Sequence, residues 1–477
     1  MTTNCVEAAK PGFGGACETA ASVFVFLPLP ATGAGVSYSC TSILRNFGGV
    51  QNIDLFTPYG SKSAKDPFRL RQTLPPALRL LPTRRARGLA FRVMRQFATG
   101  HNEKKLLEAT NNAVSAQQPA VAYVWPDSSL DMLRQLRDSG VPVVREMINC
   151  HRGVAKRILD AEYKRLGLEP SHSISAESVD REVEALDSCD YVFCSNNCCE
   201  QSVVDFGVPK SKVRPTSFGW EPARFKGEAR ALDAVDGPTF LFVGLVCIRK
   251  GAHLILRYWA ASGIRGRLVL VGKVEPAIKD ICAEYLRRDD VIMVKYTHDI
   301  GQFYRSADVF VFPTLEEGGP QVVNEAAGCG VPVITTAMGA ARVANGATGF
   351  VLDPLDETGW IEALRTLAED AELRRRMGVE AHRRAMSVTW EEVGGTRGRV
   401  FDEIVGKLGI GQDSQAHPGP TNLKHSIPRS GKNPKILRID DAEVVGEQIA
   451  KFCPAFGGRA RLGSPEPPRG SLDRWVA

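Results

Sequence analysis

The chain lacks a long apolar run, a strong surplus of charge and paired cysteine motifs, and each absence removes a class of protein. No stretch of its 477 residues approaches about 18 consecutive uncharged apolar residues, so we expect no membrane-spanning helix. The N-terminus includes Glu7 and lacks a basic start followed by an apolar run, so we expect no secretory signal. A formal net charge of +6 is mild and does not by itself indicate nucleic-acid binding.

The 12 cysteines are scattered, with one cluster formed by Cys189, Cys194, Cys198 and Cys199. A structural zinc site usually has paired C-x2-C units or nearby histidines. Here Cys194 ends a predicted strand, and Cys198 and Cys199 begin a predicted helix. We therefore expect no metal site and interpret the cysteines as small, reduced thiols of a cytoplasmic protein.

Apolar runs typical of buried strands alternate with helical stretches along most of the chain. In the first half, the predicted strands are 22–27, 52–58, 120–125, 141–147 and 191–196. In the second half they are 239–244, 267–272, 291–296, 309–313, 331–335 and 349–353, followed by helices at 357–368, 371–386 and 390–408. Asp127, after the third strand, is interpreted as the N-cap of the next helix.

This alternation predicts an α/β protein with two Rossmann-like parallel-sheet domains facing across a cleft. Changes in composition set the expected boundaries. They are a loose tail at 1–20, an N-terminal domain at 21–220, a linker at 221–237, a C-terminal domain at 238–390, a helix at 391–408 and a disordered tail at 409–477. Ligands of open parallel sheets bind beyond the carboxyl ends of the strands, so we expect the site in the cleft.

The loop after the strand at 309–313 has the pattern of an anion site. Two acids and two glycines form a tight turn, and Pro320 stands at the expected first residue of a short helix. Unpaired backbone N–H groups and the helix dipole favour an anion at such a helix start. A diphosphate bound there is therefore the first expectation.

Two carboxylates accompany this loop. Glu317 precedes the helix, and Glu325 lies eight residues further on, within it. A carboxylate in the helix suits the paired hydroxyls of a ribose, and one in the loop suits the hydroxyls of a sugar. Glu316 is the competing position for Glu317, and the alternative for Glu325 is a solvated charge on a short helix.

Two cations follow the first strand of the second half. The strand ends at Gly244, and Arg249 and Lys250 precede Gly251 at the start of the next helix. Adjacent cations at a strand end are placed to neutralise a phosphate. The alternative is that they are ordinary surface charges at a strand–helix turn.

Together these features resemble the retaining glycosyltransferases of family 4, which have the two-domain GT-B architecture. Residues 317–326 resemble the E-x7-E signature of that family, and Lys250-Gly251 resembles its lysine after the first strand. Further resemblance lies at 306–313, 329–334 and 346–349, and weaker resemblance at 190–195, 206–213 and 218–225. The resemblance covers roughly residues 22–408.

The resemblance implies roles for individual residues. Glu325 would hold the ribose of a nucleoside-diphosphate sugar, Glu317 would contact the donor sugar, and Lys250 with Arg249 would stabilise the leaving diphosphate. Backbone groups around the helix start, at Gly319, Pro320, Gln321 and Val322, would assist. The remaining implied site residues are Gly33 and Gly35 near the phosphates, His151 near the sugar and Tyr296 near the nucleobase. Neither a metal nor a further cofactor is implied.

The chain also departs from the family pattern. The family usually has an arginine directly after the strand-ending glycine, where this chain has Leu245. Arg249 then supplies the lost cation, or phosphate affinity rests on Lys250 alone. The double glycine of the N-terminal loop is interrupted as Gly33-Ala34-Gly35. His151 is equally open to interpretation as a polar residue of a loop.

Residues 67–102 contain eight arginines and no Asp or Glu: Arg69, Arg71, Arg79, Arg84, Arg85, Arg87, Arg92 and Arg95. From 84 to 98 most arginines lie on one side of a helical projection, and apolar residues that include Phe97 lie on the other. Such a helix can lie on an anionic membrane surface through Arg84, Arg85, Arg87, Arg92 and Arg95. The alternative is a solvated helix packed on the first domain. Nucleic acid is not expected, because no aromatic stacking pattern accompanies the arginines.

The net charge is a sum of unlike parts. The arginine-rich segment carries +8, and the tail from Gly411 carries ten basic and seven acidic residues, so the remaining residues carry −5. We expect a cytoplasmic retaining glycosyltransferase, with peripheral membrane attachment as an option, whose acceptor is a carbohydrate, lipid or small molecule. The alternatives are a non-catalytic nucleotide-sugar or membrane-surface binding protein, or a sugar-nucleotide epimerase or phosphorylase on the same architecture.

Overall fold

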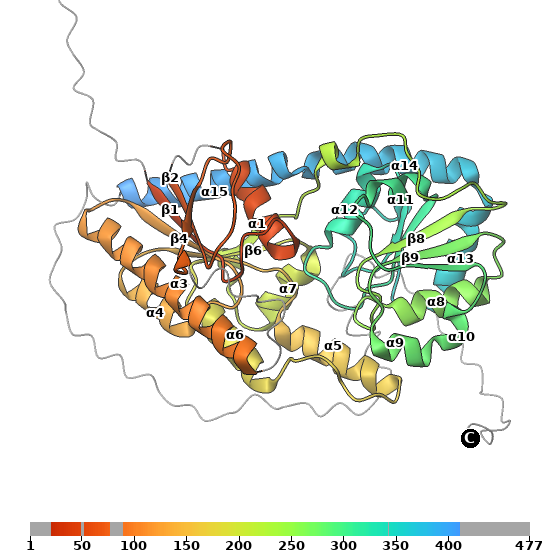
Figure 1. Ribbon diagram of the computed structural model, residues 1–477, viewed down its shortest axis with the longest axis horizontal. Helices are drawn as coiled ribbons and strands as arrows, with labels where there is room; N and C mark the ends of the chain where they lie inside the picture. Colours follow the sequence, from red (N-terminus) through yellow and green to blue (C-terminus); the bar gives the residue numbers. More distant parts are fainter. Residues whose placement is uncertain (1–20, 49–51, 77–88, 342, 411–477) are drawn as a thin grey trace, which may run out of the picture.

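A computed structural model describes residues 21–48, 52–76, 89–341 and 343–410, with side chains described except at 89–94 and 409–410. Two α/β domains lie side by side, one from each half of the chain (Figure 1). The expected class, with two Rossmann-like parallel sheets, is confirmed. The predicted tail at 1–20, and all but the start of the one at 409–477, lie outside the described residues.

The N-terminal domain has a seven-stranded parallel sheet in the order β3-β2-β1-β4-β5-β6-β7. The strands are β1 (Ser22–Phe26), β2 (Asn52–Thr57), β3 (Arg69–Gln72), β4 (Ala120–Val124), β5 (Val143–Glu146), β6 (Tyr191–Cys194) and β7 (Val213–Pro215). The helices are α1 (Gly35–Arg45), α3 (Leu89–Ser115), α4 (Leu130–Asp138), α5 (Arg152–Arg165), α6 (Ala176–Asp187) and α7 (Asn197–Asp205), with short 3-10 helices η1 (Lys210–Lys212) and η2 (Pro222–Phe225).

The C-terminal domain has a six-stranded parallel sheet in the order β10-β9-β8-β11-β12-β13. Its strands are β8 (Thr239–Val243), β9 (Arg267–Val271), β10 (Val291–Val294), β11 (Val309–Phe312), β12 (Val333–Thr335) and β13 (Gly349–Val351). Its helices are α8 (Ala252–Ser262), α9 (Pro276–Ile281), α10 (Ala283–Leu286), α11 (Gly301–Ser306), α12 (Gln321–Gly328), α13 (Glu357–Glu369), α14 (Ala371–Ala385), η3 (Met386–Val388) and α15 (Trp390–Ile410).

Both faces of the N-terminal sheet are covered, which explains why its central strands β1 and β4 are apolar along almost their whole length. Val23 and Val25 of β1 belong to the core shared with α1 and α15. Phe24 and Phe26, which point to the opposite face, belong to the core shared with α3, α4 and α6. Successive residues of one strand therefore stabilise two separate helix layers.

Every strand predicted from an apolar run is present, and two strands were missed. β3 is polar and mostly exposed, and β7 has only three residues and ends in Pro215. Both are edge strands, where one side needs no partner and the apolar pattern is weak. Strand prediction therefore failed for one polar and one very short edge strand, whereas the edge strands β10 and β13 of the second sheet were predicted from their apolar runs.

The interpretation of Asp127 as an N-cap was wrong. Ser129 caps α4, with its Oγ accepting a hydrogen bond from the Met132 N–H. Asp127 lies two residues earlier and has a φ of 71°, a left-handed conformation that Asp tolerates better than most residues. The chain turns sharply here, and the Asp127 carboxylate remains available for arginine side chains.

The arginine-rich segment is only partly described. Arg79, Arg84, Arg85 and Arg87 lie outside the described residues, as does the side chain of Arg92. Arg69 and Arg71 pair with the buried Asp54, and Arg95 pairs with Asp127. Phe97 is 57% exposed, so the apolar side of this helix is not fully buried. Membrane attachment through the segment stays a prediction, and no helix in the described ranges is long and apolar enough to cross a bilayer.

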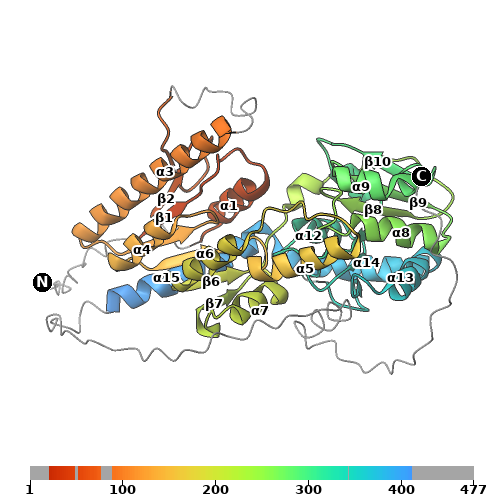
Figure 2. The ribbon, with the colours of Figure 1, turned by 90° about the horizontal axis from the view of Figure 1, so that it is seen from below.

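The C-terminal helix α15 crosses back from the second domain to the first, where it packs on α1 and β4 (Figures 1 and 2). A buried ion pair fixes it there: Arg397 Nη2 lies 2.7 Å from Glu146 Oε1 of β5, and both side chains are fully buried. Tyr123 donates a further hydrogen bond to Glu146. Although burial opposes its charge, Glu146 raises the pKa of Arg397.

We predict that Arg397→Met lowers the free energy of unfolding by about 3–5 kcal/mol, because the buried Glu146 loses its counter-charge. Urea denaturation followed by circular dichroism measures this. Arg375→Met, which removes an exposed arginine paired with Glu372, is the control and should leave the transition unchanged. The double change Arg397→Met with Glu146→Leu should recover part of the loss. Equal stability of Arg397→Met and the parent would contradict a role for this pair.

Candidate functional site

The predicted anion loop lies between β11 and α12, at the carboxyl edge of the second sheet. Pro320 was predicted as the first helical residue, but it is the N-cap, with an extended ψ of 113°, and α12 begins at Gln321. Cys329 caps the other end, followed by Gly330 at a φ of 74°. The N–H groups of the first turn thus face the loop that carries Glu316 and Glu317.

Gly251 brings Lys250 to this loop. Its φ is 69°, and a Cβ at this position would lie 1.9 Å from the carbonyl oxygen of Pro313. Only glycine permits so close an approach of the β8–α8 turn to the end of β11. This local requirement explains the Lys250-Gly251 pair of the sequence.

Four charged side chains meet at this point. Lys250 Nζ lies 2.5 Å from Glu317 Oε1, and Arg249 Nη1 lies 3.1 Å from Glu316 Oε2 and 3.5 Å from Glu317 Oε1. Both carboxylates are buried, whereas the two cations keep partial exposure. The structure therefore joins the three predicted residues and adds Glu316 as a fourth.

The pKa values of the two carboxylates move in opposite directions. Burial raises the pKa of Glu316, in spite of Arg249. For Glu317, Lys250 and Arg249 outweigh the effect of burial and lower its pKa. The Glu317 carboxylate is therefore held ionised beside two cations. An anion that reached this point could compete with the carboxylate for one of the cations.

Glu325 lies within α12 and is oriented by Tyr304. The Tyr304 hydroxyl donates to Glu325 Oε2 at 3.0 Å, and burial raises the pKa of this carboxyl. A carboxylate has acceptor capacity on both oxygens, so this bond leaves room for further donors. Tyr304 was not predicted, because a buried tyrosine in a short helix has no distinguishing pattern in the sequence.

Strand ends of the first domain meet the loop. A Cβ on Gly318 would lie 2.4 Å from the carbonyl oxygen of Ile148, and one on Gly319 would lie 2.6 Å from the Cβ of Ser195. Asn196 Nδ2 donates to the carbonyl oxygen of Gly318 at 2.8 Å. The carboxyl edges of the two sheets thus face each other, as expected, and glycines allow their contact.

The N-terminal glycine loop precedes α1, which contacts the start of α12. Gly33 and Gly35 have left-handed φ values of 72° and 55°, and a Cβ on either would meet no atom within 4 Å. They stand at the start of α1, whose Ser39 accepts a 2.6 Å hydrogen bond from Gln321 Nε2 at the start of α12. The roles of Gly33, Gly35, Gly319, Pro320, Gln321 and Val322 toward phosphate stay predictions.

His151 is fully buried and caps α5, with Nδ1 accepting from the Gly153 N–H at 3.1 Å. Burial, then nearby arginines, lower the pKa of His151 to about 4, so the ring is neutral at pH 7. The preceding Cys150 donates to Glu316 Oε1 at 3.4 Å, which places this loop against the charged cluster. A contact of His151 with a sugar stays a prediction.

Two further predictions lie on exposed positions. Tyr296 is 73% exposed and packs edge-on against His298, and its role at a nucleobase stays a prediction. Leu245 is 44% exposed at the position where the resembling family has arginine. Arg249 lies in the charged cluster, and its replacement of the missing arginine stays a prediction.

We predict that Gly319→Ala lowers stability by about 1–3 kcal/mol, because its Cβ would overlap Ser195 and Phe218 across the interface. Thermal denaturation measures the effect. Combining it with Ser195→Gly should restore part of the loss, since one of the two overlaps is removed. Gly395→Ala, on α15 with its nearest atom at 3.8 Å, is the control. A melting temperature unchanged by Gly319→Ala would contradict the tight contact.

Residues 237–370 match the family model described as "Glycosyl transferases group 1". The chain is 30% identical over 179 residues to the capsular polysaccharide biosynthesis glycosyltransferase CapM of Staphylococcus aureus, covering 35% of this chain and 47% of CapM. It is 28% identical over 202 residues to a D-inositol 3-phosphate glycosyltransferase of Paenarthrobacter aurescens, covering 39% and 49%. The chain thus spans about half the length of these curated relatives.

Solved structures resemble almost all of the described residues. Sucrose-phosphate synthase from Thermosynechococcus elongatus matches with a TM-score of 0.59 at 17% identity, over 81% of this chain and all of that one. HepE from Anabaena, solved with UDP, matches with a TM-score of 0.55 at 14% identity, over 80% of this chain and all of that one. The chain therefore has the two-domain α/β GT-B fold.

Proposed function

We propose that this protein is a glycosyltransferase that moves a sugar from a nucleoside-diphosphate sugar to an acceptor, with retention of anomeric configuration. The observation that carries the proposal is the grouping of three side chains around α12. Lys250, from the β8–α8 turn, pairs with Glu317 in the loop before α12, and Glu325 lies within the helix. Lys250 and the start of α12 match the diphosphate of one donor molecule. Glu317 matches its sugar, and Glu325 matches its ribose. The family match over 237–370 supports the proposal, because it covers this constellation.

The nucleotide would lie along α12. Glu325, held by Tyr304 through one oxygen, would accept hydrogen bonds from the ribose hydroxyls. The diphosphate would lie at the N-terminus of α12, opposite the loop of Gly33 and Gly35, where N–H groups and dipoles favour an anion. UDP is the first nucleotide to test, since HepE, of the same fold, was solved with UDP.

Catalysis would depend on the leaving group. As the bond from the anomeric carbon to the diphosphate breaks, negative charge grows on the phosphate oxygens, and Lys250 and Arg249 would stabilise it. In the structure Lys250 pairs with Glu317. Arrival of the diphosphate would draw Lys250 away and leave Glu317 to accept hydroxyls of the donor sugar.

Retention would follow from attack on the same face that the diphosphate leaves. The departing phosphate, paired with the positively charged sugar, can itself take the proton of the acceptor hydroxyl. No separate protein base is then required, and His151, buried with its Nδ1 engaged as the cap of α5, would not have to act as one. The acceptor would approach from the N-terminal domain, across the cleft.

We predict that Glu325→Ala weakens UDP binding about 10- to 100-fold, because hydrogen bonds from the ribose to a charged acceptor are lost. Isothermal titration calorimetry measures the dissociation constant. Glu362→Ala removes an exposed glutamate of α13 and is the matched control, with unchanged affinity expected. UDP affinity equal in Glu325→Ala and the parent would refute the ribose role.

We predict that Lys250→Met lowers kcat by about 10²- to 10³-fold, more than it raises KM, since its charge acts mainly on the developing diphosphate. The reaction rate is measured from the release of nucleoside diphosphate by the donor. Lys279→Met, on α9, is the control and should leave kcat unchanged. A rise in KM with no loss of kcat would show that Lys250 only binds the donor.

A further inference from the structure

A polar cavity lies entirely within the N-terminal domain. It has a volume of about 780 Å³ and lies among the start of α3, the turn after β4, and helices α4 to α6. Its wall contains five arginines: Arg95, Arg134, Arg145, Arg152 and Arg181. None of the residues placed at the donor site above lines this cavity.

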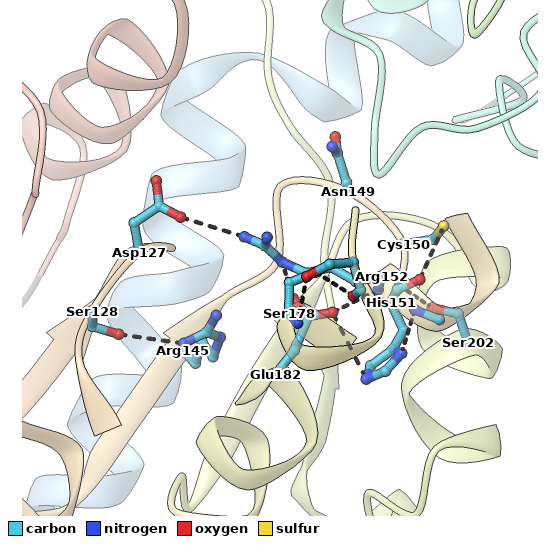
Figure 3. Close-up of polar contacts among 12 residues, drawn as sticks. Asp127, Ser128, Arg145, Asn149, Cys150, His151, Arg152, Ser178, Glu182 and Ser202 are labelled. Carbon is cyan, nitrogen blue, oxygen red and sulfur yellow. Dashed lines mark hydrogen bonds and ion pairs between the residues drawn. The ribbon is translucent and has the colours of Figure 1, made fainter. Parts of the chain in front are cut away.

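Arg145 distinguishes this cavity from a solvated charged surface. Its side chain leaves β5 on the face opposite Glu146, so it points away from the Arg397 pair and toward α6. The residue is 4% exposed, and the one hydrogen bond found for its side chain is from Nη1 to Ser128 Oγ, at 3.3 Å (Figure 3). Within the described residues Nε has no partner and no carboxylate lies within ion-pair distance.

A buried guanidinium without a counter-charge is costly, and proteins usually pair such a group. The four carboxylates that line the cavity have other partners: Glu103 accepts from Ser129, and Asp131 lies 3.9 Å from Arg134. Asp127 pairs with Arg95 and also with Arg152. Glu182 accepts from the backbone N–H of Arg152 and lies 3.5 Å from its Nε, and Figure 3 shows Arg152 between these two carboxylates. An anion that enters the cavity from outside the chain would give Arg145 the counter-charge that the protein does not supply.

The loop after β5 links this cavity to the donor site. Arg152 lines the cavity, whereas Cys150, two residues earlier, contacts Glu316 of the charged cluster. An anion held by Arg145 and Arg152 would thus belong to a molecule that reaches from the N-terminal domain toward the donor sugar. That is the position of an acceptor.

We propose that this cavity binds a phosphate monoester group of the acceptor, an inference that rests on the proposed glycosyltransferase function. Arg145 provides a fork of donors suited to two oxygens of one anion. Arg152 pairs with Asp127 and Glu182, but its side chain is 37% exposed and lies in the same wall, so it would add a second guanidinium. Two guanidinium groups and the Ser128 hydroxyl fit a doubly charged group better than a single carboxylate. The acceptor class is a phosphorylated sugar, cyclitol or lipid headgroup.

Inorganic phosphate tests the site directly, with UDP at saturation so that the diphosphate position is filled. Calorimetric titration at constant ionic strength should detect phosphate binding to the full chain. Arg145→Gln should weaken it about tenfold or more and leave UDP affinity unchanged. Arg383→Gln, which removes an exposed arginine of α14, is the control of equal charge. Unchanged phosphate affinity in Arg145→Gln, or no phosphate binding to the parent, would overturn the proposal.

A second variant protects the test against a folding defect. Arg152 is more than one-third exposed, so Arg152→Gln should fold, and it should also weaken phosphate binding. If it does not, the proposal fails even where Arg145→Gln is insoluble. Glycerol 1-phosphate and vesicles that contain phosphatidic acid then show whether the monoester is soluble or borne by a lipid. Binding of either ligand supports the site if the binding requires Arg145. If the parent protein does not bind UDP, the result refutes the donor proposal and not the phosphate site.

Discussion

The structure depends on the pairing of two buried carboxylates with two cations at the junction of the sheets. Glu316 and Glu317 leave the end of β11, and Arg249 and Lys250 leave the end of β8. Buried carboxylates without partners would protonate or destabilise the fold by several kcal/mol. The cluster therefore requires the β8–α8 turn to approach Pro313 closely, which in turn requires Gly251.

The same cluster couples the domains. Glycines 318 and 319 let the loop touch the strand ends of the first domain, and Cys150 reaches Glu316 from the other side. The C-terminal helix α15 returns to the first domain, where the ion pair between Arg397 and Glu146 fixes it. A further interdomain contact joins His253 of α8 to Glu162 of α5 at 2.5 Å. A ligand that alters the charge of the cluster thus acts at the point where both domains meet.

The sequence predicted apolar strands well and polar or very short strands poorly. Each strand that forms a continuous apolar run was found, including β10 and β13 at the edges of the second sheet, whereas the polar β3 and the three-residue β7 were missed. Gly251 and Glu317 carried enough local pattern to predict the charged loop. Tyr304 and the unpaired Arg145 did not, because one tyrosine or arginine becomes distinctive only through its burial and its neighbours. The N-cap at Ser129 was likewise hidden, since Asp127 and Ser129 are both good caps and only the fold selects between them.

The most direct test is release of nucleoside diphosphate from a panel of nucleotide sugars, by the full chain without acceptor. We predict slow release from at least one donor and its loss in Lys250→Met. Tight binding of a nucleotide with no release from any donor would contradict a catalytic role and indicate a binding protein on the same fold.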